Sequence, residues 1–147
     1  MHMPYLKTVY GPISRAFRMA LGDLVGNIVP FKDGLLDRES LVMMAGMDYV
    51  TPWTRDASIN TWNGAGLLFP DVTRNTLLSV LGESDGELRI TGEYWDAIIW
   101  AVGAWWQYLY TGDLDFLRIA YDSVKNSLSF FEETEFSPDC LTLHPTW

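Results

Sequence analysis

Apolar residues recur at helical spacing in five stretches of the chain, separated by polar or glycine-containing segments. The first stretch begins at Ser14, a suitable N-cap residue, and continues at intervals of three and four residues until Pro30. Residues 31–54 show no sustained period, which predicts a long ordered loop with some local helix or strand. A helix, followed by a loop leading into a second helix, is therefore expected in the first third of the chain.

Two later stretches are apolar on more than one side, which is typical of inner helices. They begin near Asp56 and Gly92, about 40 residues apart. Helices beginning at Pro70 and after Asp113 each have a single apolar stripe, which is typical of outer helices. The polar residues 83–90 between them predict a connection that can hold a short strand.

The order of these five helices is outer, inner, outer, inner, outer, a repeat typical of stacked helical hairpins. We therefore expect an all-α fold, with residues 1–147 in a single domain. Periodicity alone fits an open solenoid and a closed toroid equally well.

Composition and charge indicate which classes of molecule the chain can bind. The chain is 48% hydrophobic and 20% charged, as expected for a globular domain, and its net charge is −9. The 10 Lys and Arg residues are scattered, which argues against binding to nucleic acid. The aromatic fraction of 14% includes seven Trp residues, which serve either a thick core or the binding of sugar rings.

Cys140 is the single cysteine, and His2 and His144 lack metal-ligand spacing with it. No internal disulfide, metal or cofactor is therefore expected. The sequence shows neither a secretory leader pattern nor an apolar run near the length of about 20 residues that spans a bilayer. These features predict a cytoplasmic protein that does not contact a membrane.

Two chemically similar segments lie at the starts of the predicted inner helices, at residues 49–56 and 92–96. Each combines a carboxylate with aromatic side chains. An Asp in the first turn stabilises a helix without any ligand, so either Asp alone has a structural explanation. Trp53, Arg55 and Asp56 together supply the stacking face, donors and acceptor that a pyranose ring requires.

Residues 53–57 (Trp-Thr-Arg-Asp-Ala) resemble the Trp-Thr-Arg-Asp-Ser segment of glucoamylases. Residues 94–100, followed by Tyr108 and residues 111–117, are similar to the pattern Asp-Ala-x-x-Trp … Tyr-x-x-Thr-Gly-Asp-x-x-Phe-Leu. That pattern recurs in bacterial glycogen-debranching amylo-1,6-glucosidase-like proteins and other six-hairpin (α/α) toroid glycoside hydrolases. The similarity covers about residues 45–135. It implies a glycosidase of the α-glucosidase, glucoamylase or debranching type acting on an oligosaccharide or polysaccharide.

Carried over by position, the resemblance implies that Arg55 and Asp56 bind sugar hydroxyls beside the cleaved bond. It implies that Asp96 binds a hydroxyl or positions water. Three aromatic side chains would shape the pocket: Trp53, Trp95 and Trp100. The general acid and base of such enzymes lie on later hairpins. The chain is therefore expected to be an N-terminal part of an incomplete toroid, with its catalytic residues unassigned.

Two other functions remain open. One is a different six-hairpin activity, such as a phosphorylase, a rhamnosidase-like hydrolase or a sugar epimerase. The other is a non-catalytic helical-repeat module for protein interaction or sugar binding. The matching placement of the two motifs favours the enzyme. Inner helices left uncovered predict self-association, or a barrel whose remainder is supplied elsewhere.

Overall fold

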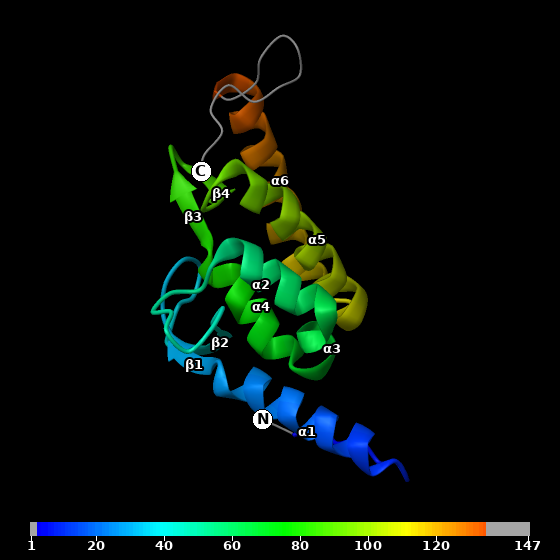
Figure 1. Ribbon diagram of the computed structural model, residues 1–147. Coiled ribbons are helices and arrows are strands. Elements are labelled where there is room, and N and C mark those ends of the chain that lie inside the picture. The colour runs from blue at the N-terminus through cyan, green and yellow to red at the C-terminus, as the bar shows by residue number, and fades with distance from the viewer. Residues whose placement is uncertain (1–2, 135–147) are drawn as a thin grey trace.

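The computed structural model describes residues 3–134 and combines helices with two small sheets (Figure 1). Its main helices are α1 Gly11–Gly26, α2 Thr54–Asn60, α4 Pro70–Ser79, α5 Tyr94–Thr111 and α6 Leu114–Thr134. A π-helical stretch, η1 Thr61–Ala65, and the short helix α3 Gly66–Leu68 continue α2. The strands are β1 Ile28–Phe31, β2 Ser40–Met43, β3 Leu81–Ser84 and β4 Glu87–Ile90.

The prediction of an all-α fold is wrong, because the described residues also form two antiparallel hairpins. β1 pairs with β2, so part of the predicted loop 31–54 is a strand. β3 pairs with β4 around Asp85 and Gly86, whose φ angles are 55° and 79°. Asp-Gly is a preferred pair for a two-residue hairpin turn with positive φ. This dipeptide was the signal in the sequence for the second hairpin.

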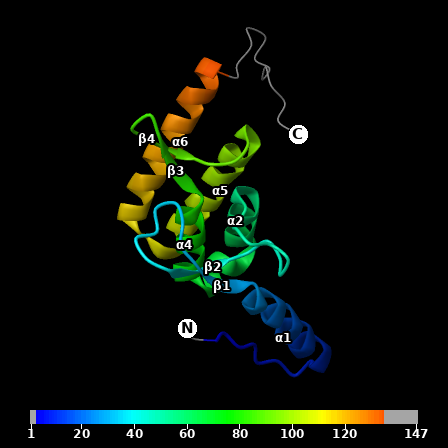
Figure 2. The same ribbon diagram turned by 90° about the vertical axis from the view of Figure 1, so that its left-hand side faces the viewer.

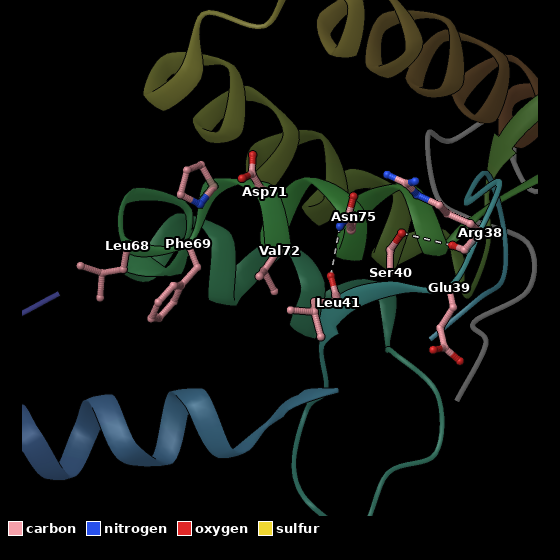
Figure 3. A pocket seen from close by; sticks show the side chains of 10 residues that line it. Arg38, Glu39, Ser40, Leu41, Leu68, Phe69, Asp71, Val72 and Asn75 are labelled. Carbon is pink, nitrogen blue, oxygen red and sulfur yellow. Dashed lines mark hydrogen bonds between the residues drawn. The ribbon is translucent and has the colours of Figure 1, made fainter. Parts of the chain in front are cut away.

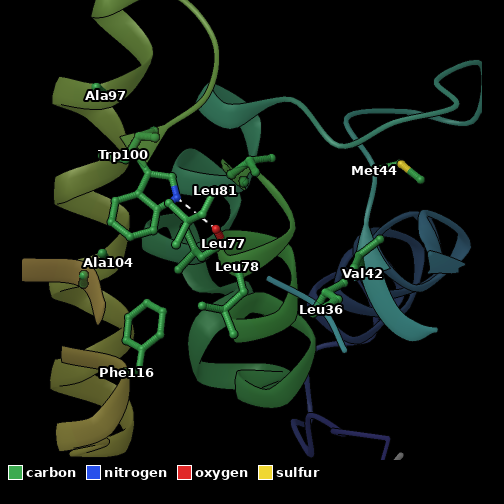
Figure 4. Close-up of a cluster of buried hydrophobic side chains, with 14 residues drawn as sticks. Leu36, Val42, Met44, Leu77, Leu78, Leu81, Ala97, Trp100, Ala104 and Phe116 are labelled. Atoms are coloured by element: carbon green, nitrogen blue, oxygen red, sulfur yellow. Dashed lines mark hydrogen bonds between the residues drawn. The ribbon is translucent and has the colours of Figure 1, made fainter. Parts of the chain in front are cut away.

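The main core lies where α4, α5 and α6 meet (Figure 4). Trp100 of α5 and Phe116 of α6 are fully buried there beside Leu77 of α4. The Trp100 indole N–H donates to the Leu77 carbonyl oxygen at 3.2 Å, which satisfies the one polar group of that ring. α4 therefore occupies a central position, with β2 on another of its sides.

α1 extends away from the rest of the molecule in both views (Figures 1 and 2). None of its residues is buried, and only its C-terminal part packs on a small cluster that contains Phe69 and Val72. It begins after Tyr10 rather than at Ser14 and ends at Gly26, because the residues before Pro30 pair as β1. Pattern alone misplaced both ends of this helix.

The start of α6 after Asp113 agrees with its prediction. Gly112 adopts a left-handed conformation that ends α5, and Asp113 accepts the Phe116 N–H at 2.9 Å as the N-cap of α6. The buried stripe of α6 is not purely apolar, since Ser127 is buried whereas Tyr121 faces outward. Ser127 Oγ accepts the Ile90 N–H, so a small polar residue lets β4 approach the helix.

Candidate functional site

The two sequence motifs meet in space because α2 and α5 pack closely against each other. Ser58 Oγ donates to the Ile99 carbonyl oxygen at 2.5 Å and accepts the Gly103 N–H at 2.9 Å. A Cβ atom on Gly103 would lie 2.5 Å from the Ser58 Cα atom, so only glycine permits this approach. The close contact brings the beginnings of the two helices to the same end of the pair.

Side chains connect the motifs at that end. Thr54 Oγ1 donates to the Thr91 carbonyl oxygen at 2.8 Å. Arg55 Nε lies 3.2 Å from Asp96 Oδ1 and forms an ion pair between helix beginnings that are 41 residues apart in the chain. The motif at the start of α2 and the motif at the start of α5 therefore form one site.

A capping box at the start of α5 holds the two carboxylates of the site. Asp96 Oδ2 accepts the Glu93 N–H at 3.1 Å, and the Glu93 side chain accepts the Asp96 N–H. Gly92 has φ 103°, and a Cβ there would lie 2.6 Å from Asp96 Oδ2. Glycine is therefore required at this position for both its backbone angle and the space it leaves.

These residues line a hollow of about 310 Å³, within the lower range of small-molecule sites. Its lining consists of Pro52, Trp53, Thr54, Arg55, Thr91, Gly92, Glu93 and Asp96. Trp53 is 57% exposed, and the Tyr49 ring contacts it edge-on with ring centroids 5.6 Å apart. The hollow thus combines an accessible indole, a guanidinium group and two carboxylates.

The remaining predicted site residues lie elsewhere. Asp56 is in the first turn of α2 but does not line the hollow. Trp95 is half-exposed on α5, also outside the lining. Trp100 lies in the core with none of its surface exposed, so it has no surface with which to contact a sugar. Sequence spacing indicated the helix but not which of its faces is buried.

A larger hollow of about 670 Å³ lies between β2 and the start of α4 (Figure 3). Leu68, Phe69 and Val72 form an apolar wall, and their side chains point to the same side. Asn75 Nδ2 donates to the Leu41 carbonyl oxygen at 3.2 Å beside it. No sequence motif indicated this hollow, because it depends on packing between segments that carry no recognisable chemistry.

Within the described residues, no three or more His, Cys, Asp and Glu side chains gather as metal ligands would. His2, Cys140 and His144 lie outside the described residues. No helix of residues 3–134 combines the length and apolar character required to cross a membrane.

No family model, curated protein or solved structure matches the chain. The resemblance to six-hairpin (α/α) toroid glycoside hydrolases is therefore contradicted, since no relative supports it and the fold contains two β-hairpins. The motifs have a local explanation. Residues 93–96 form a capping box, and residues 111–113 end one helix and cap the next. Many unrelated helices use the same residues at their ends.

Proposed function

We propose that the hollow at the beginnings of α2 and α5 binds a neutral carbohydrate. The observation that carries this proposal is the Arg55–Asp96 ion pair, which joins the two motifs beside the exposed Trp53 indole. An indole face packs against the C–H surface of a sugar ring. Fixed donors and acceptors at its edge are suited to hydroxyl groups.

The charges of the site favour an uncharged ligand. Arg55 contributes one positive charge, while Glu93 and Asp96 contribute two negative charges. The chain as a whole carries −9, which opposes the approach of phosphate or other anions. A polyhydroxylated ligand that both donates and accepts hydrogen bonds matches this mixture of groups.

The proposal is for binding rather than for hydrolysis. Glycoside hydrolysis normally uses two carboxyl groups on either side of the bond, one of which donates a proton to the leaving oxygen. Both Asp96 oxygens accept hydrogen bonds from Arg55 and Glu93, and the Glu93 side chain caps α5. These carboxylates are therefore held as parts of the helix beginning, and their remaining lone pairs can accept hydrogen bonds from hydroxyl groups.

The test is an NMR titration of the indole N–H signals with maltose, cellobiose and other neutral oligosaccharides. The Trp53 signal, assigned from Trp53→Phe, should shift in a saturable manner. Trp53→Ala should weaken binding about tenfold or more. The stacking of a nucleic-acid base on an aromatic side chain is a comparable contact, and it contributes about 1–3 kcal/mol. Asp96→Asn should weaken it by a smaller factor, because the amide keeps a hydrogen-bonding group.

Trp62→Ala is the matched control, since Trp62 is 45% exposed and does not line the hollow. It should leave affinity unchanged. The proposal fails if no oligosaccharide shifts the Trp53 signal at high millimolar concentration, or if Trp62→Ala weakens binding as much as Trp53→Ala does.

A further inference from the structure

One face of α5 exposes large apolar side chains at alternating intervals of three and four residues. We call this row the α5 seam, and each of its side chains is between 41% and 52% exposed: Trp95, Ile98, Val102, Trp105 and Leu109. This spacing places the five side chains in one row along the helix. The seam is therefore suited to packing against another helix with the same repeat.

The seam is free of charge along its length. Asp96, in the first turn, is the one charged residue of α5, and it pairs with Arg55. Ala97, Trp100 and Ala104 lie on the opposite side of the helix and are buried in the core. The exposed apolar row is thus additional to the face that stabilises the monomer, and contiguous apolar patches of this kind mark interaction sites.

We propose that the α5 seam binds the α5 seam of a second copy of the chain in antiparallel orientation. A two-fold axis near Val102 would place the two Val102 side chains against each other. Ile98 of one copy would then face Trp105 of the other, and Trp95 would face Leu109. Each large indole meets an aliphatic side chain, whereas a parallel pair would place each indole against its own copy.

Charge also selects the antiparallel arrangement. Glu93 and Asp96 give the beginning of α5 two carboxylates. A parallel pair would bring these groups of both copies together and would align the two helix dipoles. In the antiparallel pair they lie at opposite ends of a helix of 18 residues, which is about 27 Å long.

The seam has enough surface for a weak specific interface. Trp side chains bury roughly 150–250 Å² each when fully covered and aliphatic side chains bury less, and those of the seam are about half exposed. Covering the seams of both copies completely therefore buries at most about 1,000 Å², at the lower limit for specific complexes. We expect a concentration-dependent dimer that tightens with added salt, because each copy carries a net charge of −9.

Sedimentation equilibrium of the full chain tests the proposal. The mass should rise with concentration from 16.7 kDa towards twice that value. Val102→Arg should weaken association about tenfold or more, because two guanidinium groups would meet at the axis. Leu128→Arg is the control, since Leu128 is 46% exposed on α6 and lies outside the seam. Circular dichroism melts should confirm that both variants fold.

Disulfide trapping then tests the orientation in a Cys140→Ser background. Val102→Cys should cross-link to itself. Ile98→Cys should cross-link to Trp105→Cys faster than to a second copy of Ile98→Cys. A chain that stays monomeric at every concentration would overturn the proposal. Faster cross-linking between identical positions, or dissociation by Leu128→Arg alone, would overturn it as well.

Discussion

The two faces of α5 have similar composition and opposite environments. One face places Trp100 between α4 and α6 with none of its surface exposed. The other presents Trp105 to solvent with 52% of its surface exposed. Both faces are rich in apolar residues, so hydrophobicity does not distinguish them. The difference is decided by where α4 and α6 pack, which no local pattern within α5 specifies.

The buried face is also distinguished by how its polar groups are satisfied. Gln107 is fully buried, and its Nε2 donates to the Pro70 carbonyl oxygen at 2.9 Å. Its Oε1 lies 2.7 Å from Thr73 Oγ1. A buried amide without such partners would destabilise the fold by a few kcal/mol. Complementary hydrogen bonding therefore distinguishes this buried face from the exposed one.

The largest expected difference in stability is between two variants of α5, each of which truncates an indole on a different face. Trp100→Ala should lower the free energy of unfolding by about 3–5 kcal/mol, because it removes a large buried side chain and leaves a cavity. Trp105→Ala should lower the monomer's stability by less than about 1 kcal/mol, since half of that side chain already contacts water.

Urea denaturation at low protein concentration measures both values. Phe116→Leu provides an intermediate reference within the same core, because Phe116 contacts Trp100 with ring centroids 6.4 Å apart. If Trp105→Ala destabilises the monomer as much as Trp100→Ala, then both faces of α5 stabilise the monomer and the difference between them is contradicted.

An intermediate effect is expected from adding one methyl group at a helical glycine. Gly103→Ala should destabilise the protein by about 1–3 kcal/mol, because its Cβ would overlap Ser58 and separate α2 from α5. Gly22→Ala on α1 should instead stabilise its helix by up to about 1 kcal/mol, since a Cβ there meets no atom within 4 Å.

Thermal melts measure the loss of stability in Gly103→Ala, and amide hydrogen exchange of α1 measures the gain in helix stability in Gly22→Ala. Because the contact at Gly103 also positions Arg55 beside Asp96, Gly103→Ala should weaken carbohydrate binding. A Gly103→Ala variant as stable as the parent chain would show that α2 and α5 separate without cost.

The smallest effect concerns the turn that directs α6 onto the buried face of α5. The Phe116 N–H lowers the pKa of Asp113 below its ordinary value of 3.8, with further lowering by the Arg74 guanidinium 2.9 Å away. Because the folded-state pKa is lowered, the ionised carboxylate stabilises the fold fully above that ordinary value. This stabilisation is lost as the pH falls through the lowered pKa.

Asp113→Asn retains a capping oxygen but cannot ionise, so its cost should be below about 1 kcal/mol at neutral pH. Its stability should also vary less than that of the parent chain between about pH 5 and pH 2. Asp115→Asn is the control, since the side chains of Asp115 and Arg118 are both exposed in their ion pair. Urea denaturation measures the stability of each variant as a function of pH. If stability depends on pH equally in Asp113→Asn and in the parent chain, the ionised Asp113 carboxylate does not stabilise the fold.

Much of the helical framework could be predicted from the sequence, because helix ends carry local chemistry. Pro70 at the start of α4 and Asp113 before α6 lie where the sequence placed them. The two hairpins were missed, although Asp85 and Gly86 form a known turn pair. Residues 28–30 of β1 were assigned to the end of a helix, because a short apolar run fits either period.

The candidate site could be predicted only in part. Residue types and spacing identified Trp53, Arg55 and Asp96, which the structure brings into one hollow. The same reasoning included Trp100, which lies in the core, and it missed the role of Gly103 in bringing the helices together. Spacing along a helix identifies residues on one face, but it does not show what covers that face.

The sequence by itself determined where most helices begin and end, because caps, glycine stops and proline act over only a few residues. It also determined that two motifs, each with a carboxylate, lie at the beginnings of two helices. Arg55 of the first motif and Asp96 of the second are 41 residues apart in the chain. Only the tertiary structure decided that these motifs meet, that Trp100 is buried and that Trp105 is exposed. Burial depends on contacts between distant segments, and apolar attraction has no direction of its own, so the packing of the whole chain selects the face.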